Sequence, residues 1–355
     1  MLSWNRLIAD AGLQLAFFTG IAQIAERCKG GAGVILKFEH VRPPRAGSFQ
    51  PLRSREVSPE FLDKAIRAMR RWRYDFLSMD EVKARAQQSA LAQRFVCLTF
   101  EGAYRDFMTF AYPVLSRHRV PFTLYVPTGF VDGIGEAWWL ALEEIVARNP
   151  RIGLMIDDVE KRFGTGTTDE KYEVYGLLYD WLQSLPPADL SAAIGDLCTR
   201  YGADLKAMSR ANAMTWPDLA KLARDPQATI GSATVHYPAV SRAKSNIVLR
   251  EMTMGRSILE TALGNECRHF AYPFGDSVSF GSRDILLAQE AGFVTAVSAQ
   301  PGVVRADGKS DLFSLPRVAW DGRRKSIGSL RAVLSGIALR QERGVPPDIH
   351  VNNYV

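Results

Sequence analysis

A short apolar run that ends in a polar turn constrains the fold of this chain more than any other segment. Residues 95–98, Phe-Val-Cys-Leu, have the continuous hydrophobicity of a parallel strand that is buried on both faces. The run continues into Thr-Phe-Glu-Gly, and an amphipathic helix is predicted to follow. In α/β folds, catalytic side chains lie at the carboxyl ends of such strands. Glu101 is therefore a candidate catalytic carboxylate, whereas the next residues, Gly102 and Ala103, offer no side-chain ligand atom.

The composition is typical of a globular protein and gives no sign of a nucleic-acid partner. The chain has 355 residues, of which 47% are hydrophobic, and a formal net charge of +6. This length suffices for a large core. Basic residues cluster at 67–73 and 323–325, but neither cluster has the aromatic or motif support of a nucleic-acid site, so we expect no nucleic-acid partner. The four cysteines lie far apart without a Cys-x-x-Cys pair, which favours reduced thiols and a cytoplasmic location.

Several segments together resemble one protein family. Residues 99–106, Thr-Phe-Glu-Gly-Ala-Tyr-Arg-Asp, are similar to the first motif of the polysaccharide deacetylases, Thr-Phe-Asp-Asp-Gly-Tyr-Arg-Asp. These are the NodB-homology enzymes, of the carbohydrate esterase 4 type. Residues 33–41 resemble the family's first strand, 229–238 its second motif, 270–275 its third motif, and 315–318 its late Leu-Pro-Arg-Val strand. The resemblance implies an α/β fold, a distorted (β/α) barrel of the NodB-homology deacetylase type with a helical insertion.

The resemblance also suggests how the chain is divided. We expect an N-terminal helical segment over residues 1–32 and a deacetylase-like barrel domain over 33–330, with the helical insertion at about 133–214. A C-terminal helix end and tail follow over 331–355. Helical spacing and capping signals predict helices over 58–73, 172–185, 188–201 and 326–340.

The apolar N-terminal stretch, Ala11 to Ala25, is shorter than the roughly 20 residues that a membrane span needs. We expect an amphipathic helix that packs on the domain. The alternatives are contact with a membrane surface through residues 7–25, or export by an atypical N-terminal segment.

The sequence departs from the family pattern at the residues that bind the metal and act as the general base. In the family, an Asp and two His hold a divalent metal, and the positions that match them are Gly102, Ala233 and Tyr237. Glu101 matches the general base, and Glu39 matches a histidine unless the register slips by one residue onto His40. A zinc site needs about three or four N, O or S donors. We therefore expect no cofactor.

Zinc remains an alternative only if a rearranged site exists. His236 lies one residue before a lost ligand, and it could in principle join Glu101, Asp106 and Glu39 in such a site. The alternative for His236 is a partly exposed loop histidine with no ligand role.

The residues expected to form the substrate groove match the family pattern better than the residues at the metal positions do. Trp138 and Trp139 match a Trp-Trp pair often found in the family, and aromatic rings can stack on sugar rings. The alternative is that they pack as core residues. Tyr272 and Phe274 are expected to line the same barrel mouth, and the resemblance makes the backbone N–H of Phe274 a candidate oxyanion donor. Arg317 and Asp284 could form ion pairs or contact a ligand.

Two functions stay open. The resemblance implies a hydrolase that acts on carbon–nitrogen bonds other than peptide bonds, a carbohydrate de-N-acetylase of chitooligosaccharide-like N-acetylated glycans. The lost ligands make metal-dependent amide hydrolysis doubtful, because an unaided water has a pKa of about 15.7. The alternative is a non-catalytic pseudoenzyme that binds a glycan, a small carbohydrate or a protein.

Overall fold

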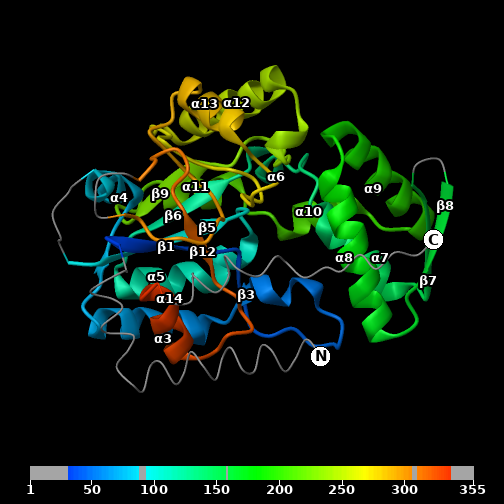
Figure 1. The fold of residues 1–355 in the computed structure, drawn as a ribbon, viewed down its shortest axis with the longest axis horizontal. Helices are drawn as coiled ribbons and strands as arrows, with labels where there is room; N and C mark the ends of the chain where they lie inside the picture. Colours follow the sequence, from blue (N-terminus) through cyan, green and yellow to red (C-terminus); the bar gives the residue numbers. More distant parts are fainter. Residues whose placement is uncertain (1–30, 88–92, 157–158, 306–309, 337–355) are drawn as a thin grey trace.

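A nearly closed sheet of parallel strands forms the centre of the molecule (Figure 1). The computed structural model describes residues 31–87, 93–156, 159–305 and 310–336. The sheet contains β1 (Gly33–Phe38), β4 (Asp75–Phe76), β5 (Phe95–Glu101), β6 (Phe122–Val126), β9 (Ala228–Ser232), β10 (His269–Ala271), β11 (Thr295–Val297) and β12 (Arg317–Ala319).

The strand order is β11-β10-β9-β6-β5-β1-β12, and β4 pairs with β5. A parallel bridge between Val297 and Leu315 links β11 to the chain just before β12. This bridge brings the two edges of the sheet together, which confirms the distorted (β/α) barrel.

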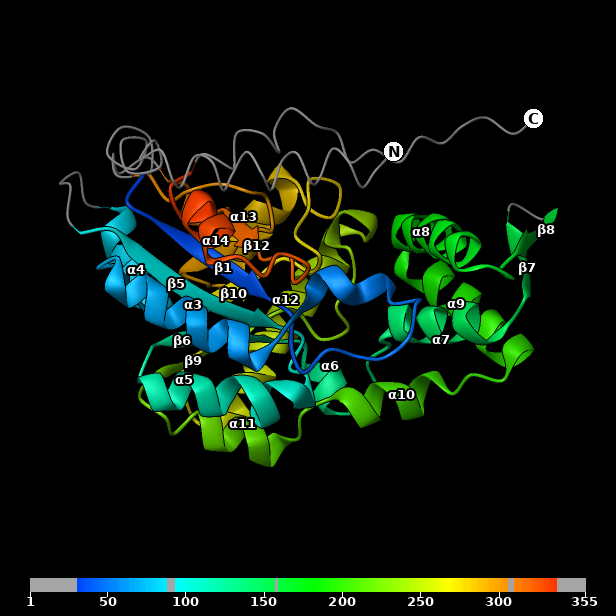
Figure 2. The same cartoon turned by 90° about the horizontal axis from the view of Figure 1, so that it is seen from below.

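Helices cover the outside of this barrel (Figure 2). In chain order they are α3 (Pro59–Arg71), α4 (Met79–Ala86), α5 (Tyr112–His118), α6 (Thr128–Val131), α11 (Trp216–Leu222), α12 (Ser245–Leu263), α13 (Ser282–Glu290) and α14 (Ile327–Leu334). Short elements are β2 (His40–Val41), β3 (Glu56–Val57), the 3-10 turns Pro51–Arg55 and Val240–Arg242, and a π turn at Phe107–Ala111. The predicted start of the first helix is confirmed, since the Ser58 hydroxyl accepts a hydrogen bond from the Phe61 N–H at 3.2 Å.

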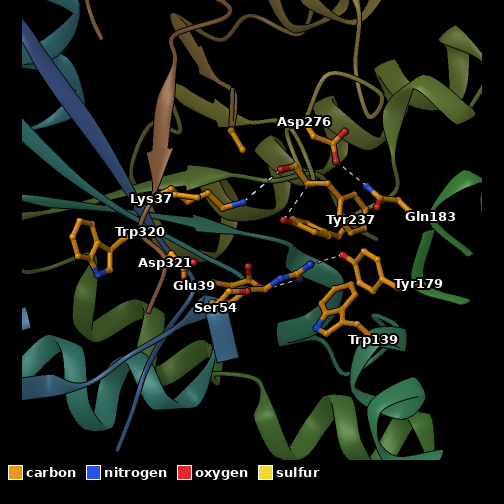
Figure 3. A pocket seen from close by; sticks show the side chains of 14 residues that line it. Lys37, Glu39, Ser54, Trp139, Tyr179, Gln183, Tyr237, Asp276, Trp320 and Asp321 are labelled. Carbon is orange, nitrogen blue, oxygen red and sulfur yellow. Dashed lines mark hydrogen bonds and ion pairs between the residues drawn. The ribbon is translucent and has the colours of Figure 1, made fainter. Parts of the chain in front are cut away.

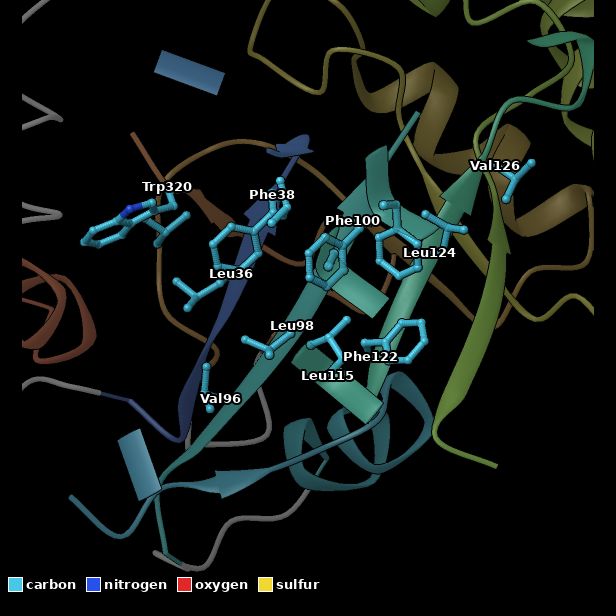
Figure 4. Packing of buried hydrophobic residues seen from close by; sticks show 14 of the residues in the cluster. Leu36, Phe38, Val96, Leu98, Phe100, Leu115, Phe122, Leu124, Val126 and Trp320 are labelled. Atoms are coloured by element: carbon cyan, nitrogen blue, oxygen red, sulfur yellow. The ribbon is translucent and has the colours of Figure 1, made fainter. Parts of the chain in front are cut away.

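The central strands do not alternate between polar and apolar residues, because both of their faces are buried. All seven residues of β5 are buried. Figure 4 shows Val96, Leu98 and Phe100 packed in the cluster on one face of the strand, whereas Phe95 and Cys97 belong to a separate cluster. Phe100 of β5 stacks on Phe38 of β1, with ring centroids 5.2 Å apart, and meets Phe107 edge-on at 5.0 Å. These ring contacts hold neighbouring strands and the following helix together, as expected for strands buried on both faces.

The insertion lies beside the barrel and has its own hydrophobic cluster (Figures 1 and 2). It comprises α7 (Trp138–Arg148), β7 (Arg151–Ile156), β8 (Val159–Gly164), α8 (Thr168–Ser184), α9 (Pro187–Tyr201) and α10 (Leu205–Asn212). The helices predicted over 172–185 and 188–201 correspond to α8 and α9. The antiparallel hairpin β7–β8 is not part of the sequence expectation, and most of the side chains of β8 are exposed. Such exposed, charged strands lack the apolar alternation that identifies a strand in a sequence.

Two expectations fall on parts of the chain outside the described residues: the N-terminal helical segment up to residue 30, including its possible membrane contact, and the tail from residue 337 onward. Within the described residues, no helix combines the length and the apolar character that crossing a membrane requires.

The turn after β5 depends on a glycine. Gly102 has a φ of +93°, in the left-handed region where a side chain is strained. A Cβ atom built there would lie 2.3 Å from Cε2 of Tyr104, so the tyrosine ring occupies the space that a side chain would need. Gly102 therefore fits its turn as a glycine, at the position that the resemblance matches to a metal-binding aspartate.

We predict that Gly102→Ala lowers the free energy of unfolding by about 1–3 kcal/mol, the usual cost of such backbone strain. Gly176→Ala on α8 is the matched control, because a Cβ there meets nothing within 4 Å. That control should be neutral or stabilising by up to about 1 kcal/mol, since alanine favours a helix. Urea denaturation of both variants measures the difference, and equal effects would contradict the steric argument.

Candidate functional site

Glu101, at the carboxyl end of β5, lies inside the barrel mouth between two cations. Its residue exposure is only 2%. The Lys37 Nζ lies 2.6 Å from Glu101 Oε2, and the Arg317 guanidinium donates to Oε1. The Tyr237 hydroxyl also donates to Oε2, at 3.3 Å. Both carboxylate oxygens are therefore engaged by groups of the protein itself.

The barrel strands place these cations. Lys37 comes from β1 and Arg317 from β12, and β1 lies between β12 and the β5 strand of Glu101. Arg317 is fully buried, and its Nε donates to the Ser298 carbonyl oxygen at 2.6 Å. Its Nη1 lies 3.4 Å from the Thr99 hydroxyl oxygen. Burial alone would raise the pKa of Glu101, but Arg317 and Lys37 beside it bring that pKa below its usual value. Glu101 is thus held as an anion.

At the three positions that the resemblance matches to metal ligands, the residues present do not suit a metal ion. The Gly102 position has no room for a side chain, and Ala233 is fully buried without a ligand atom. The Tyr237 ring packs against Phe274, with centroids 5.2 Å apart, and against Trp139 at 5.9 Å. Burial and the nearby Glu101 raise the pKa of the Tyr237 phenol well above its usual range, so a phenolate ligand is disfavoured. The residues present do not fit zinc.

The acidic and histidine candidates for a rearranged site are each paired elsewhere. His236 Nδ1 lies 2.7 Å from Glu251 of α12, and its side chain is 55% exposed. Asp106 lies 2.7 Å from His40 Nδ1, and Glu39 lies 3.3 Å from the Arg55 guanidinium. Across the described residues, no cluster of three His, Cys, Asp or Glu side chains could hold a metal ion.

A pocket of about 330 Å³ opens where the barrel meets the insertion (Figure 3). Its barrel side is lined by Lys37, Glu39, Ser54, Arg55, Tyr237, Phe274, Asp276, Ala299, Ala319, Trp320 and Asp321. The insertion contributes Trp139 from α7 and Tyr179 and Gln183 from α8. The pocket thus combines aromatic faces with charged groups, a combination typical of ligand sites.

The expected groove residues divide between this pocket and the core. Trp139 and Phe274 line the pocket, but Trp138 does not, and it packs on Tyr179 with ring centroids 4.8 Å apart. Tyr272 does not line it either. Its ring stacks on Phe280 at 4.2 Å, and its hydroxyl donates to the Phe313 carbonyl oxygen at 2.8 Å. Tyr272 follows β10 on the core side, which corrects the expectation that it lines the mouth.

Other groups named from the sequence also have defined partners. The Phe274 N–H, the candidate oxyanion donor, donates to the Tyr237 hydroxyl at 3.3 Å. Asp284 is buried at the start of α13, where its carboxylate accepts from the Gly281 N–H at 2.9 Å and pairs with Arg283. Asp284 therefore caps a helix and forms an ion pair.

The sequence reasoning missed the pocket residues Lys37, Arg55, Tyr179, Gln183 and Asp276. Only Lys37 carries a local signal, since a lysine interrupts the otherwise apolar β1 strand Gly-Val-Ile-Leu-Lys-Phe. A charged residue inside a buried strand needs a partner, and such partners gather where functional groups lie.

Solved structures share this architecture. A Streptococcus pyogenes deacetylase, PplD, determined in complex with acetate, superposes with a TM-score of 0.56 at 17% identity, covering 86% of this chain and 99% of that one. IcaB from Ammonifex degensii gives 0.55 at 14% identity, with 86% and 98% covered. A de-N-acetylase from Aggregatibacter actinomycetemcomitans gives 0.52 at 12% identity, with 84% and 98% covered.

This chain has the polysaccharide deacetylase fold. No protein-family model and no curated protein sequence matches it. At identities this low, the likeness concerns the fold alone, and the chemistry has to be argued from the residues at the mouth of the barrel.

We predict that Glu101 contributes to the acid dependence of stability. Because its folded-state pKa is lowered, the ionised carboxylate stabilises the fold fully above the unfolded value of about 4.3. That contribution is lost as the pH falls through the folded-state pKa. The difference in unfolding free energy between wild type and Glu101→Gln should therefore shrink from pH 6 to pH 3, as measured by urea denaturation.

The exposed Glu290, on α13, supplies the control. Glu290→Gln removes the same charge without touching the barrel mouth, so its difference from wild type should change much less over the same pH range. A flat difference for Glu101→Gln would contradict the ion-pair assignment.

Proposed function

We propose that this protein binds a carbohydrate, of the N-acetylated glycan class, at the barrel mouth and does not hydrolyse it by the metal-dependent route. The observation that carries the proposal is the Lys37–Glu101–Arg317 cluster. A general base has to accept a proton from water, and its pKa should lie near the working pH. Glu101 has a lowered pKa, both of its oxygens are engaged, and it does not line the pocket.

The residues at the barrel mouth also disfavour the activation of a water molecule for attack on an amide. Metal coordination lowers the pKa of a water from about 15.7 to about 7. The side chains at positions 102, 233 and 237 do not supply the donors for such a metal, as described above. The Phe274 N–H, which could stabilise an oxyanion, is engaged by Tyr237. Both the base and the electrophilic assistance of amide hydrolysis are therefore disfavoured.

The pocket itself favours a sugar ligand. The partly exposed Tyr179, Tyr237 and Phe274 supply aromatic faces on which the apolar faces of sugar rings can stack, beside the more deeply buried Trp139 and Trp320. Asp276, Gln183 and Ser54 supply polar groups that can meet hydroxyls. A de-N-acetylase acting on chitooligosaccharide-like glycans is the competing function, which the fold favours and the mouth residues disfavour.

We predict that the purified protein contains far less than one zinc, cobalt or nickel per chain, as measured by elemental analysis. Incubation with chitooligosaccharides should release no acetate above background, with or without added zinc or cobalt. A catalytically active deacetylase assayed in parallel controls for the substrate. Acetate release at a rate comparable to that enzyme, or one tightly held metal per chain, would show that the protein is a hydrolase.

We further predict that Tyr179→Leu weakens carbohydrate binding about two- to tenfold, because an aromatic contact contributes about 0.5–1.5 kcal/mol. Tyr179 lines the pocket from α8, whereas Tyr172 on the same helix does not. Tyr172→Leu is therefore the matched control and should bind like wild type. Titration calorimetry against a panel of neutral and acidic oligosaccharides measures both. If both variants lose affinity equally, the ligand does not occupy this pocket.

A further inference from the structure

We propose that the outer face of helices α3 and α5 binds a membrane surface rich in anionic phospholipids. This face, which we call the basic face, lies outside the carbohydrate pocket, and the inference does not rest on the function proposed for that pocket. The basic face consists of seven exposed side chains: Lys64, Arg67, Arg70, Arg71, Arg73, Arg117 and Arg119.

Most of the net charge of the chain is concentrated in these two helices and the residues that end them. Residues 59–73 and 112–119 contain seven lysine and arginine residues and two carboxylates, Glu60 and Asp63, which gives a net charge of +5. The whole chain has a formal net charge of +6. Cations and carboxylates therefore nearly balance over the rest of the chain, and the basic face is the part that attracts an anion.

The packing of α5 beside α3 joins the cations of both helices into one surface (Figures 1 and 2). The Arg117 guanidinium of α5 lies 2.6 Å from an Asp63 carboxylate oxygen of α3. Asp63 also pairs with Arg67, one turn along the same helix. The Arg70 guanidinium donates to the His118 carbonyl oxygen at the end of α5. Two segments that are far apart in the sequence thus contribute to the same patch.

Several of these charges are not neutralised by the protein. Lys64 and Arg71 lie three residues before and four residues after Arg67, so helical spacing places them on the same side of α3. Within the part of the chain that the structure describes, the side chains of Lys64, Arg71, Arg73 and Arg119 have no hydrogen-bond or ion-pair partner. These exposed cations are available to a partner outside the molecule.

The stabilisation of helix ends explains only part of this pattern. Cations in the last turn of a helix interact favourably with its dipole, which accounts for Arg70, Arg71 and Arg117. Lys64 lies in the N-terminal half of α3, where a cation has no such role. Arg73 and Arg119 have φ values of +62° and +48°, in the left-handed region that helices commonly enter through a glycine. Both helices thus end with a long cation at a position where glycine fits the backbone better.

The form of the basic face favours a layer of lipid headgroups over a nucleic acid. α3 buries its other side through Phe61, Leu62 and Ile66, so it does not project from the surface as a helix that enters a DNA groove must. In the described residues, no aromatic side chain of α3 or α5 is exposed for stacking on unpaired bases. A headgroup layer needs only a broad surface of cations, because each lysine or arginine near it contributes to binding.

Binding through this face leaves the carbohydrate pocket accessible. α3 and α5 end just before β4 and β6, at the amino ends of the barrel strands, so the arginines at the helix ends lie there too. Glu101 and the mouth of the barrel lie at the carboxyl ends of the strands. The protein therefore contacts the membrane with the opposite end of the barrel and keeps its pocket open to the solution.

Co-sedimentation of the full-length protein with two kinds of vesicle tests the inference. One kind contains phosphatidylcholine alone, and the other an equimolar mixture of phosphatidylcholine and phosphatidylglycerol. The protein should bind the mixed vesicles and not the neutral ones, and its binding should fall as salt is added, because salt screens exposed charges. Equal binding to both kinds of vesicle, or binding to neither, would overturn the inference.

A double variant tests whether the basic face makes the contact. Lys64→Gln with Arg71→Gln removes two exposed cations and should weaken binding to the mixed vesicles about tenfold or more, as expected for two basic residues at an anionic surface. Lys161→Gln with Arg162→Gln on the exposed strand β8 removes the same charge and should bind like wild type. Equal losses in the two double variants would show that net charge alone acts, and would overturn the assignment to this face.

Duplex and single-stranded DNA, titrated at the same salt concentrations, distinguish the competing partner. The protein should bind both more weakly than it binds the mixed vesicles. If DNA binds more tightly than the vesicles, and the Lys64→Gln, Arg71→Gln variant loses that binding, the basic face is a nucleic-acid site and the inference is wrong.

Discussion

The buried carboxylate of Glu101 is the charge on which the architecture of the barrel mouth depends. A buried ion is costly unless it is paired and hydrogen-bonded, and removing one partner of a buried pair costs about 3–5 kcal/mol. Lys37 and Arg317 satisfy Glu101 from β1 and β12, and Tyr237 completes the set from the loop after β9. The same contacts join three neighbouring strands. The network therefore stabilises the mouth and, by placing two cations beside the carboxylate, lowers its pKa.

Two of the positions that the resemblance matches to metal ligands, Gly102 and Tyr237, take part in the packing and hydrogen bonding of the mouth. The ring of Tyr104 occupies the space beside Gly102, and the hydroxyl of Tyr237 accepts from the Phe274 N–H while it donates to Glu101. Tyr237 thus bridges the general-base position and the candidate oxyanion donor. At the mouth of the barrel, Glu101, Tyr237 and the Phe274 N–H thus form one hydrogen-bonded network.

Local patterns in the sequence predicted the fold well. The apolar run at 95–98 became β5, and the capping serine at 58 begins α3, because burial and capping act through neighbouring residues. The pocket was predicted only in part. Arg55 and Tyr179 are 124 positions apart yet hydrogen-bonded at 2.7 Å, and no local pattern records such a contact. Tyr272 was misplaced because the motif around it fixes its position in the chain, whereas its stacking on Phe280 decides its direction.

The position of the pocket indicates where its specificity resides. The barrel residues at its floor are committed to one another, so substitution there changes stability as well as binding. On the pocket side, α8 is attached to the barrel through hydrogen bonds of Tyr179 to Arg55 and of Gln183 to Asp276 and Ser279. Both side chains are half-buried and line the pocket. The barrel therefore contributes charged groups that are committed to one another, whereas α8 contributes Tyr179 and Gln183, which are only partly buried.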